Sequence, residues 1–362
     1  MRQWRWVVVL GVVALLCSLP VIASNWPVTE PDIEPEALRT LVAGSAAQPF
    51  EGLFESRGGL RLPDLGRLDD EVAPFRTSSR VRVWYGGPEQ WRADELLVGA
   101  ERAVYREPGG LWLWDSGRRR IVFSPREVEE PLRIPRLMDF SPAELGRRLV
   151  RESDVESISS IPARRVAGRT GAGLRITPTS PSATIDHVDI WADPVTGVVL
   201  AVEIDTGGTA PVFETAWVDF RYATPDGDVV TFDPNEIDEP VREAVVVDAV
   251  ESASATAFAL PFPDVLAGLP RRSAPLAALA TYGEGLTVVN VLVVPQGGLG
   301  RRIAALPRVE RPWGGEAALV ETSLVNVQIA RVGGFDVVLA GTVDVAELDR
   351  IAGVVAAAGS VL

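Results

Sequence analysis

The side chains that most readily carry out chemistry are scarce in this chain, and the first candidate is its single histidine. His187 lies between Asp186 and Asp189, a combination that can bind a metal ion or move a proton. We expect His187 to lie in a strand, where alternation sends the two carboxylates to opposite faces. A zinc site also needs further ligands, and the only cysteine, Cys17, belongs to an apolar N-terminal run. The residues therefore predict a surface histidine and no metal site.

Nucleophilic and phosphate-binding motifs are missing from the sequence as well. No serine stands in a Gly-x-Ser-x-Gly elbow, and no lysine occurs with which a glycine-rich loop could hold phosphate. The cluster Gly297-Gly298-Leu299-Gly300 lacks the dinucleotide-binding spacing, so it indicates a turn. Two of the 49 acidic residues could still form the carboxylate pair of a glycoside hydrolase, although no spacing singles out a pair. We predict no catalytic residues and no cofactor, with such a hydrolase as the residual alternative.

Aromatic residues are the remaining candidates for a binding site. Ten tryptophans occur, and several fall on expected strands at alternate positions, as Trp112 and Trp114 do. A concave sheet lined by such side chains can hold an apolar ligand. The alternative is that they fill the core beneath helices. The predicted apolar cavity is lined by Val81, Val83, Trp84, Trp91, Trp112, Trp114, Trp191 and Trp217.

The elements that would position these residues are mostly strands. Alternating runs recur about every ten residues between Phe50 and Tyr222, and turns rich in glycine and proline separate them. The segment Asp193-Pro194-Val195-Thr196-Gly197 has the residue types of a tight hairpin turn. A helix beginning at Pro35 precedes the strands, and a second helix, capped by Ser141, interrupts them. This order predicts an antiparallel sheet accompanied by helices.

The C-terminal part differs in kind, because it is richer in alanine and valine. A stretch rich in proline and aspartate, residues 225–240, marks the expected boundary. The expected elements are a short helix from Phe262, a hairpin around Gly283-Glu284-Gly285, a short helix over residues 299–306, strands over 317–331 and 335–341, and a final helix capped by Asp344. The pattern predicts a small α+β unit.

The chain begins with a charged and then apolar segment. Arg2 and Arg5 precede an apolar run from Trp6 to Ala23, the composition of a secretory signal. The run is also near the roughly 17–25 residues that a spanning helix needs. Because the basic residues stay in the cytoplasm, the remainder would cross the membrane. The sequence therefore predicts an extracytoplasmic protein, with residues 1–26 either cleaved or kept as a membrane anchor.

The overall composition narrows the choice of partners. A hydrophobic content of 47% is sufficient for large cores. All 35 basic residues are arginine, yet the net charge is −14. A strongly negative chain argues against nucleic acid or an anionic membrane surface as the main partner. With its single cysteine in the N-terminal run, the rest of the chain has no disulfide.

Several segments resemble the lipoprotein-carrier superfamily of LolA, LolB and LppX. Val81–Tyr85 resembles a strand reading RVWY in actinobacterial members, and Leu113-Trp114-Asp115 is similar to their WTWD segment. Residues 188–200 resemble the pattern W-x-D-P-x-T-G-x-P-L, with Val198-Val199 replacing the usual Leu-Pro. Residues 335–351 are similar to the closing strand and helix of the RseB C-terminal domain. Together these segments make the chain look most like the two-domain sigma-factor regulators of the MucB/RseB type.

The resemblance implies a half-open antiparallel β-barrel with covering helices, over residues 27–240, and a smaller α+β domain over 241–362. It implies non-catalytic binding of acyl chains or of an acylated protein, and the family has no fixed polar site residues to carry over. The first functional hypothesis is therefore a lipid or lipoprotein carrier at the outer face of the cell membrane. The alternative is an envelope-stress sensor that binds an anti-sigma factor, and a membrane transporter is a further candidate partner.

Overall fold

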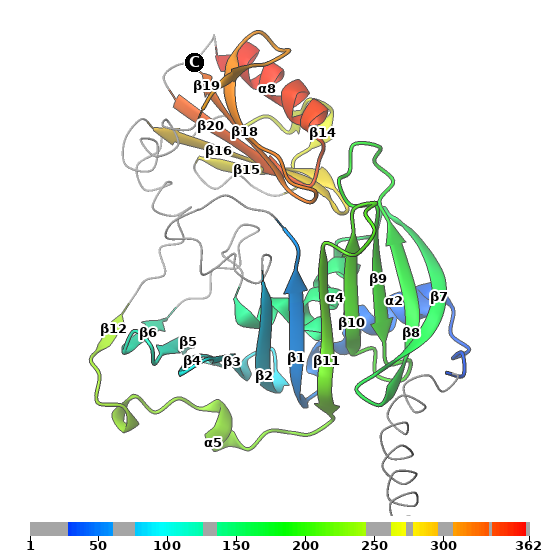
Figure 1. Ribbon diagram of the computed structural model, residues 1–362, viewed down its shortest axis with the longest axis vertical. Helices are drawn as coiled ribbons and strands as arrows, with labels where there is room; N and C mark the ends of the chain where they lie inside the picture. The colour runs from blue at the N-terminus through cyan, green and yellow to red at the C-terminus, as the bar shows by residue number, and fades with distance from the viewer. Residues whose placement is uncertain are drawn as a thin grey trace, which may run out of the picture.

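The computed structural model describes residues 28–60, 77–125, 136–243, 262–272, 278–295, 307–332 and 335–359. They form a large, curved sheet with two helices on its concave side, and a smaller sheet with one helix (Figure 1). The N-terminal segment 1–26 and the expected helix over 299–306 lie outside the described residues. Within the described ranges, no helix is both long and apolar enough to cross a membrane.

The large sheet is antiparallel, as expected, with one exception. Its strand order is β12-β6-β5-β4-β3-β2-β1-β11-β10-β9-β8-β7, and only β12 runs parallel to its neighbour. The sheet is curved but is not a closed barrel, because β12 and β7 remain its two edges. Its strands are β1 (Phe50–Gly58), β2 (Ser78–Gly87), β3 (Gln90–Leu97), β4 (Ala100–Glu107), β5 (Gly110–Asp115), β6 (Arg120–Ser124), β7 (Ser157–Val166), β8 (Arg169–Thr177), β9 (His187–Ala192), β10 (Val199–Asp205), β11 (Phe213–Arg221) and β12 (Val241–Glu243).

Strand pairing assigns each side chain to one of two faces. Residues directly opposite each other on neighbouring strands share a face. Val83 pairs with Ala93, and Ala93 pairs with Val104, so all three lie on the concave face. Trp84 pairs with Arg92, and both therefore lie on the convex face. The concave side chains of both halves of the sheet join one hydrophobic cluster, which also contains the apolar faces of the helices.

Two helices fill one half of the concave side. The Ser141 hydroxyl accepts the Glu144 backbone N–H at 3.2 Å and so caps the second helix, as predicted. The first helix buries Leu38 and Val42, one turn apart. These helices contact β7, β8, β10 and β11, whereas the short turn η4 contacts β3. The helical elements of this part are α2 (Pro35–Gly44), η1 (Ser45–Ala47), η4 (Leu137–Phe140), α4 (Pro142–Arg151), α5 (Gly227–Val230) and η5 (Pro234–Glu236).

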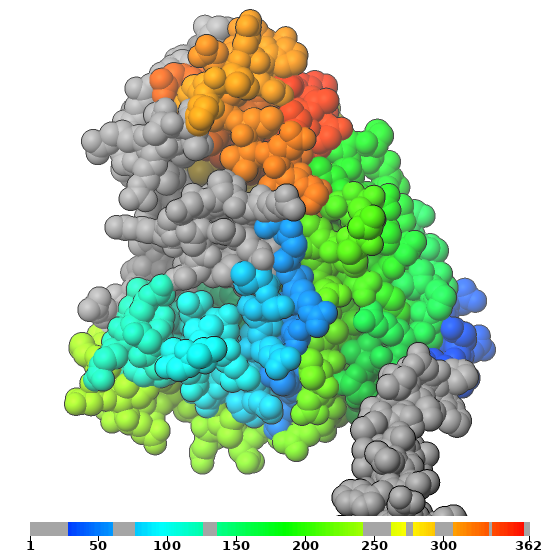
Figure 2. All heavy atoms as spheres, in the orientation of Figure 1, coloured from blue at the N-terminus to red at the C-terminus, as the bar shows by residue number. Residues whose placement is uncertain are grey.

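The segment 225–240, expected as a boundary, packs against the convex face of the large sheet. The Phe232 N–H donates to Glu107 at 2.7 Å, and the Phe232 ring lies 5.1 Å from the rings of both Tyr105 and Trp112. Arg119 forms an ion pair with Glu239. Figure 2 shows this yellow-green segment beside the cyan strands β2–β6. Residues 241–243 continue along the sheet as β12, which pairs with β6.

The second sheet has six strands with α8 on one face. The final helix starts as predicted, since Asp344 accepts the Glu347 N–H at 2.7 Å. The expected helix from Phe262 was wrong: Ala267 and Gly268 have φ of 50° and 85°, which closes a tight two-residue hairpin. The elements are β13 (Val265–Leu266) and β14 (Leu269–Pro270), a separate hairpin, then β15 (Leu279–Glu284), β16 (Thr287–Pro295), β17 (Val309–Glu310), β18 (Glu316–Val320), β19 (Asn326–Val332), β20 (Phe335–Gly341) and α8 (Val345–Gly359).

The single strand expected over residues 317–331 is two strands, β18 and β19. The chain turns between them because Thr322 and Asn326 hold the backbone. The Thr322 hydroxyl accepts the N–H of Val325 at 2.9 Å, and the Asn326 side chain accepts the Thr322 N–H, also at 2.9 Å. Such local side-chain bonds compete with a continuous strand.

Backbone hydrogen bonds join the two sheets. The Thr184 N–H donates to the Thr342 carbonyl at 3.1 Å, and the Asp344 N–H donates to the Ser182 carbonyl at 2.8 Å. In addition, the Glu156 carboxylate accepts the Leu286 N–H at 2.8 Å. Because these donors and acceptors satisfy each other, the seam between the sheets is a specific contact.

Candidate functional site

The eight residues predicted to line an apolar cavity do not share one face of the large sheet. Strand pairing divides them equally. The concave face carries Val81, Val83, Trp91 and Trp217. The convex face carries Trp84, Trp112, Trp114 and Trp191. One cavity on one face can therefore contain at most half of the predicted set, and the role of each residue in ligand binding stays a prediction.

Trp217 belongs to the core beneath the helices. It is 2% exposed, and its ring lies 5.4 Å from that of Phe50 and 5.6 Å from that of Phe54. Its indole N–H donates to the Val199 carbonyl at 3.0 Å. Val199 in turn packs against α4, where a Cβ on Gly146 would lie 2.7 Å from its methyl groups. This half of the concave face is filled by protein side chains.

The other half of the concave face carries a continuous apolar row. Its members are direct partners on successive strands from β2 to β6, namely Val83, Ala93, Val104, Leu113 and Val122. Four of them are buried, and Leu113 is half-buried. The main contacts of these strands include η4 but neither α2 nor α4. We call this set the apolar row. Only Val83 was singled out from the sequence, although alternation on each strand would have indicated the others.

Charged groups border the apolar row on both sides. On one side Arg102 lies 3.3 Å from Glu95 and 3.9 Å from Asp115. On the other side Arg106, which is opposite Trp91, lies 2.8 Å from Glu89. Arg102 and Arg106 are 20% and 10% exposed at their side chains, so these guanidinium groups are mostly removed from water. An apolar strip flanked by such groups suits an amphipathic ligand better than a wholly apolar one.

The convex aromatic residues form a separate cluster under the segment 225–240. The Trp112 ring lies 4.3 Å from the Phe123 ring and 5.1 Å from the Phe232 ring, and it is tilted against both. The Arg92 guanidinium lies 5.0 Å from the Trp84 ring and 4.7 Å from the Tyr105 ring, at cation–π distance. Among these contacts, the one between Phe232 and Trp112 holds the segment on the sheet.

Asp94 is a buried carboxylate on this convex face. It is 4% exposed, and its oxygen lies 2.6 Å from Arg92. Burial nevertheless raises the pKa of Asp94 to about 6 from 3.8, because the lost hydration outweighs the attraction of Arg92. Asp94 therefore keeps its proton up to a higher pH in the folded protein than in the unfolded chain.

We expect the contribution of Asp94 to the stability of the protein to fall as the pH rises from about 4 to about 6. Between about pH 4 and pH 6 the folded state retains the Asp94 proton that the unfolded chain releases, so this group removes up to about 3 kcal/mol from the free energy of unfolding. Urea unfolding at a series of pH values measures the decline, which should be smaller in Asp94→Asn. Asp219→Asn, at an exposed position on β11, is the control and should keep the wild-type slope. Parallel pH profiles for the wild type and Asp94→Asn would contradict this expectation.

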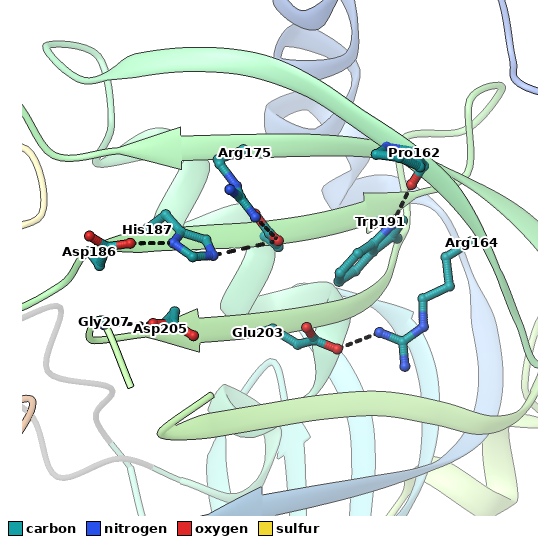
Figure 3. A network of polar contacts seen from close by, with 10 residues as sticks. Pro162, Arg164, Arg175, Asp186, His187, Trp191, Glu203, Asp205 and Gly207 are labelled. Carbon is teal, nitrogen blue, oxygen red and sulfur yellow. Dashed lines mark hydrogen bonds and ion pairs between the residues drawn. The ribbon is translucent and has the colours of Figure 1, made fainter. Parts of the chain in front are cut away.

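The single histidine lies in a polar network on the convex face of β8–β10 (Figure 3). Its Nδ1 is 2.7 Å from Asp186 and its Nε2 is 3.7 Å from Asp189. Asp186 precedes β9, so strand alternation does not separate the two carboxylates as expected, and the ring contacts both. Asp186, His187 and Asp205 could offer metal ligands within 4.8 Å of one another. Arg175 already donates to both oxygens of Asp189 at 2.7 Å, and the prediction of no metal site stays a prediction.

Trp191 closes the other end of this network (Figure 3). Its indole N–H donates to the Pro162 carbonyl at 3.0 Å, and the Arg164 guanidinium lies 4.8 Å from its ring. Arg164 is also paired with Glu203. The ring is 8% exposed, so these neighbours cover it. A packing role accounts for all of its contacts.

A small cleft lies where the two sheets meet. Its volume is about 260 Å³, and residues from both sheets line it, including Glu156, Glu284 and Thr287. The two oxygens of Glu156 accept the N–H groups of Leu286 and Thr179 at 2.8 and 2.7 Å. The Glu156 carboxylate, engaged by these two backbone donors, therefore serves to join the two sheets.

Comparisons with known proteins give structural likeness at low identity. No family model and no curated protein matches the chain. Similar solved structures include the MucA/MucB complex of Pseudomonas aeruginosa, at 17% identity and a TM-score of 0.47, covering 88% of this chain and 96% of the other. A putative outer membrane lipoprotein-sorting protein domain from Vibrio parahaemolyticus matches at 12% identity and a TM-score of 0.25, covering 57% and 96%. A LolA superfamily protein from Nitrosomonas europaea matches at 10% identity and a TM-score of 0.24, covering 56% and 99%. These are the groups named by the sequence resemblance.

Proposed function

We propose that this chain is an extracytoplasmic, non-catalytic binding protein that holds the acyl chain of a lipid or of an acylated protein along the apolar row. The observation that supports this most is the row itself. It crosses the sheet from β2 to β6 on the concave face, in the half where α2 and α4 make no main contact. A ligand chain lying across the strands would meet an apolar side chain at every strand.

The borders of the apolar row support an amphipathic ligand. Arg102 and Arg106 flank it, and guanidinium groups bind the carboxylate or phosphate of a head group. Val81 lies in the bordering row that contains Arg102, and Trp91 lies in the one that contains Arg106. Both residues are kept in the proposed site with Val83. The four convex residues of the original set are not part of it. The predicted signal or anchor segment, residues 1–26, supports a location outside the cytoplasm. The division into domains at 27–240 and 241–362 is kept as a proposal.

Blocking the apolar row should abolish ligand binding without unfolding the protein. Leu113 is half-buried at the centre of the row, so Leu113→Trp places a larger side chain where the acyl chain would lie. Native mass spectrometry of the full chain purified from membranes should then show at least a ~10-fold loss of co-purifying lipid, since one well-placed clash costs more than about 1.4 kcal/mol.

Val218→Trp is the matched control, because Val218 is an exposed residue on β11, away from the row. It should retain the lipid of the wild type. Circular dichroism melting of both variants separates loss of binding from loss of fold. Absence of lipid from the wild type, with no uptake of added fatty acid, would refute the proposed function.

A second candidate function is the binding of an anti-sigma factor through the C-terminal sheet. α8 packs on one face of this sheet, with Leu348 and Ile351 against Val337 and Leu339. The opposite face carries apolar side chains such as Leu292, which are only partly buried. An apolar sheet face can accept a partner segment. A gene pair for a sigma factor and its anti-sigma factor beside this gene would favour this candidate over the carrier.

A further inference from the structure

The hairpin between β3 and β4 ends in a run of exposed apolar side chains. Leu96, Leu97 and Val98 are 52%, 41% and 107% exposed. The turn is tight, because Gly99 has a φ of 75° and β4 begins at the next residue. Large apolar side chains rarely project in sequence from a soluble surface without a partner. The tip therefore presents a convex apolar surface.

A second hairpin tip lies beside the first. The Ser116 hydroxyl accepts the Glu101 N–H at 2.7 Å, and the Ser116 N–H donates to the Glu101 carbonyl at 3.0 Å. A Cβ on Gly117 would lie 3.3 Å from the Cβ of Ala100, so the two turns touch. The second tip continues into the arginine run 118–120, which is exposed throughout. The two tips form one surface with apolar residues next to guanidinium groups.

The exposed charges on this surface are mainly positive, and the exception is Glu101, whose side chain is 45% exposed and lies 3.2 Å from Arg92. The Arg118 side chain is 56% exposed, whereas Asp115, its partner at 3.2 Å, is 9% exposed. The Arg119 side chain is 73% exposed, whereas its partner Glu239 is 15% exposed. In these two pairs the carboxylates thus lie below the guanidinium groups. An approaching phosphate meets the cationic side of each pair first, although the whole chain is negative.

We propose that these paired tips are a membrane-contact surface, which inserts Leu96, Leu97 and Val98 among the head groups of a bilayer that contains anionic lipid. Apolar side chains at the centre and guanidinium groups at the border are the two components of interfacial binding. A narrow convex tip also suits a deformable bilayer better than a flat protein surface. The N-terminal segment 1–26, predicted to be a signal or a membrane anchor, would bring the chain to a membrane. This surface is separate from the apolar row and does not depend on ligand binding there.

A fluorescent probe at the tip tests this in the full chain. Cys17→Ser removes the natural cysteine, and Val98→Cys then carries an environment-sensitive label. Val195→Cys is the matched control, because Val195 is also an exposed valine in a turn. It is 81% exposed and lies between β9 and β10. Both proteins are reconstituted into vesicles of phosphatidylcholine and phosphatidylglycerol. We expect blue-shifted emission and quenching by lipids with brominated acyl chains at residue 98, and neither effect at residue 195.

Four outcomes decide between insertion and its alternatives. Loss of the shift in Leu97→Asp, measured with the label at residue 98, supports insertion of the tip, as does a smaller shift in vesicles of phosphatidylcholine alone. Equal behaviour of the two labels in all vesicles overturns the proposal. A shift that occurs without vesicles and grows with protein concentration also overturns it, because the tip would then be a surface for self-association. None of these readouts requires a bound acyl ligand, so failure here is distinct from failure of the proposed function.

Discussion

Replacing Trp217 with alanine is expected to lower the free energy of unfolding by about 3–5 kcal/mol, the range for large aromatic residues in cores. The indole contacts Phe50, Phe54 and Phe220, with ring centroids 5.3 to 5.6 Å apart. Its removal leaves a cavity under α4 and deprives the buried Val199 carbonyl of a donor at 3.0 Å. Urea unfolding followed by circular dichroism measures the change.

Trp84→Ala provides the comparison within the same chain. Trp84 is half-buried on the convex face, where its ring faces the Arg92 guanidinium, so its loss should cost only about 1 kcal/mol. Both residues were predicted to line a ligand cavity. If Trp217→Ala weakens lipid binding while stability is unchanged, the indole acts in a site and the core assignment is wrong. A large loss of stability for Trp217 alone supports the assignment to the core.

The sequence predicted those parts of the fold that depend on short-range patterns. The alternation around Trp112 and Trp114 placed both on one face of β5, and their pairing with β4 confirms this. Ser141 and Asp344 start helices because a side-chain oxygen three residues before a backbone N–H caps it whatever the tertiary fold. Phe262 was misjudged because the two positive φ angles at Ala267 and Gly268 decide that turn, and alanine gives no sign of one.

The candidate site could be predicted only in part, because it depends on contacts between distant segments. Alternation shows that Trp112 and Trp114 share a face, but it does not show which face is concave. The segment 225–240, through Phe232, covers the face with Trp112. The apolar row requires the register of four successive strand pairs, which no local pattern contains. His187 likewise contacts Asp189, which lies on the same strand β9, and it lies near Asp205, which belongs to the neighbouring strand β10.

The segment that most resembles the carrier superfamily, residues 188–200, has a structural role here. In its turn, the Asp193 side chain accepts the N–H groups of Val195 and Thr196 at 2.9 and 3.2 Å, and the Tyr222 hydroxyl donates to the same carboxylate at 2.8 Å. The Gly197 N–H donates to the Asp193 carbonyl at 2.9 Å. The resulting rigid turn sits against the backbone of α2. The motif therefore positions a helix over the sheet.

Gly197→Ala is expected to lower the free energy of unfolding by about 3 kcal/mol, which combines a left-handed backbone with a steric clash. Gly197 has a φ of 74°, and a Cβ there would lie 2.2 Å from the Leu41 carbonyl oxygen. The atom that must move is backbone of α2, so no side-chain rotation relieves the contact. Denaturant unfolding measures the loss, and α2 should show the earliest gain in amide hydrogen exchange.

Gly207→Ala separates the two contributions. Gly207 has a φ of 77°, almost the same as Gly197, but nothing lies within 4 Å of its Cβ position. The backbone conformation alone should cost about 1 kcal/mol at Gly207. The remainder at Gly197 is then the contact between the turn and α2. If both variants lose the same free energy of unfolding, α2 moves away from the added methyl group at no cost. The turn would then not be the element that fixes α2 over the sheet.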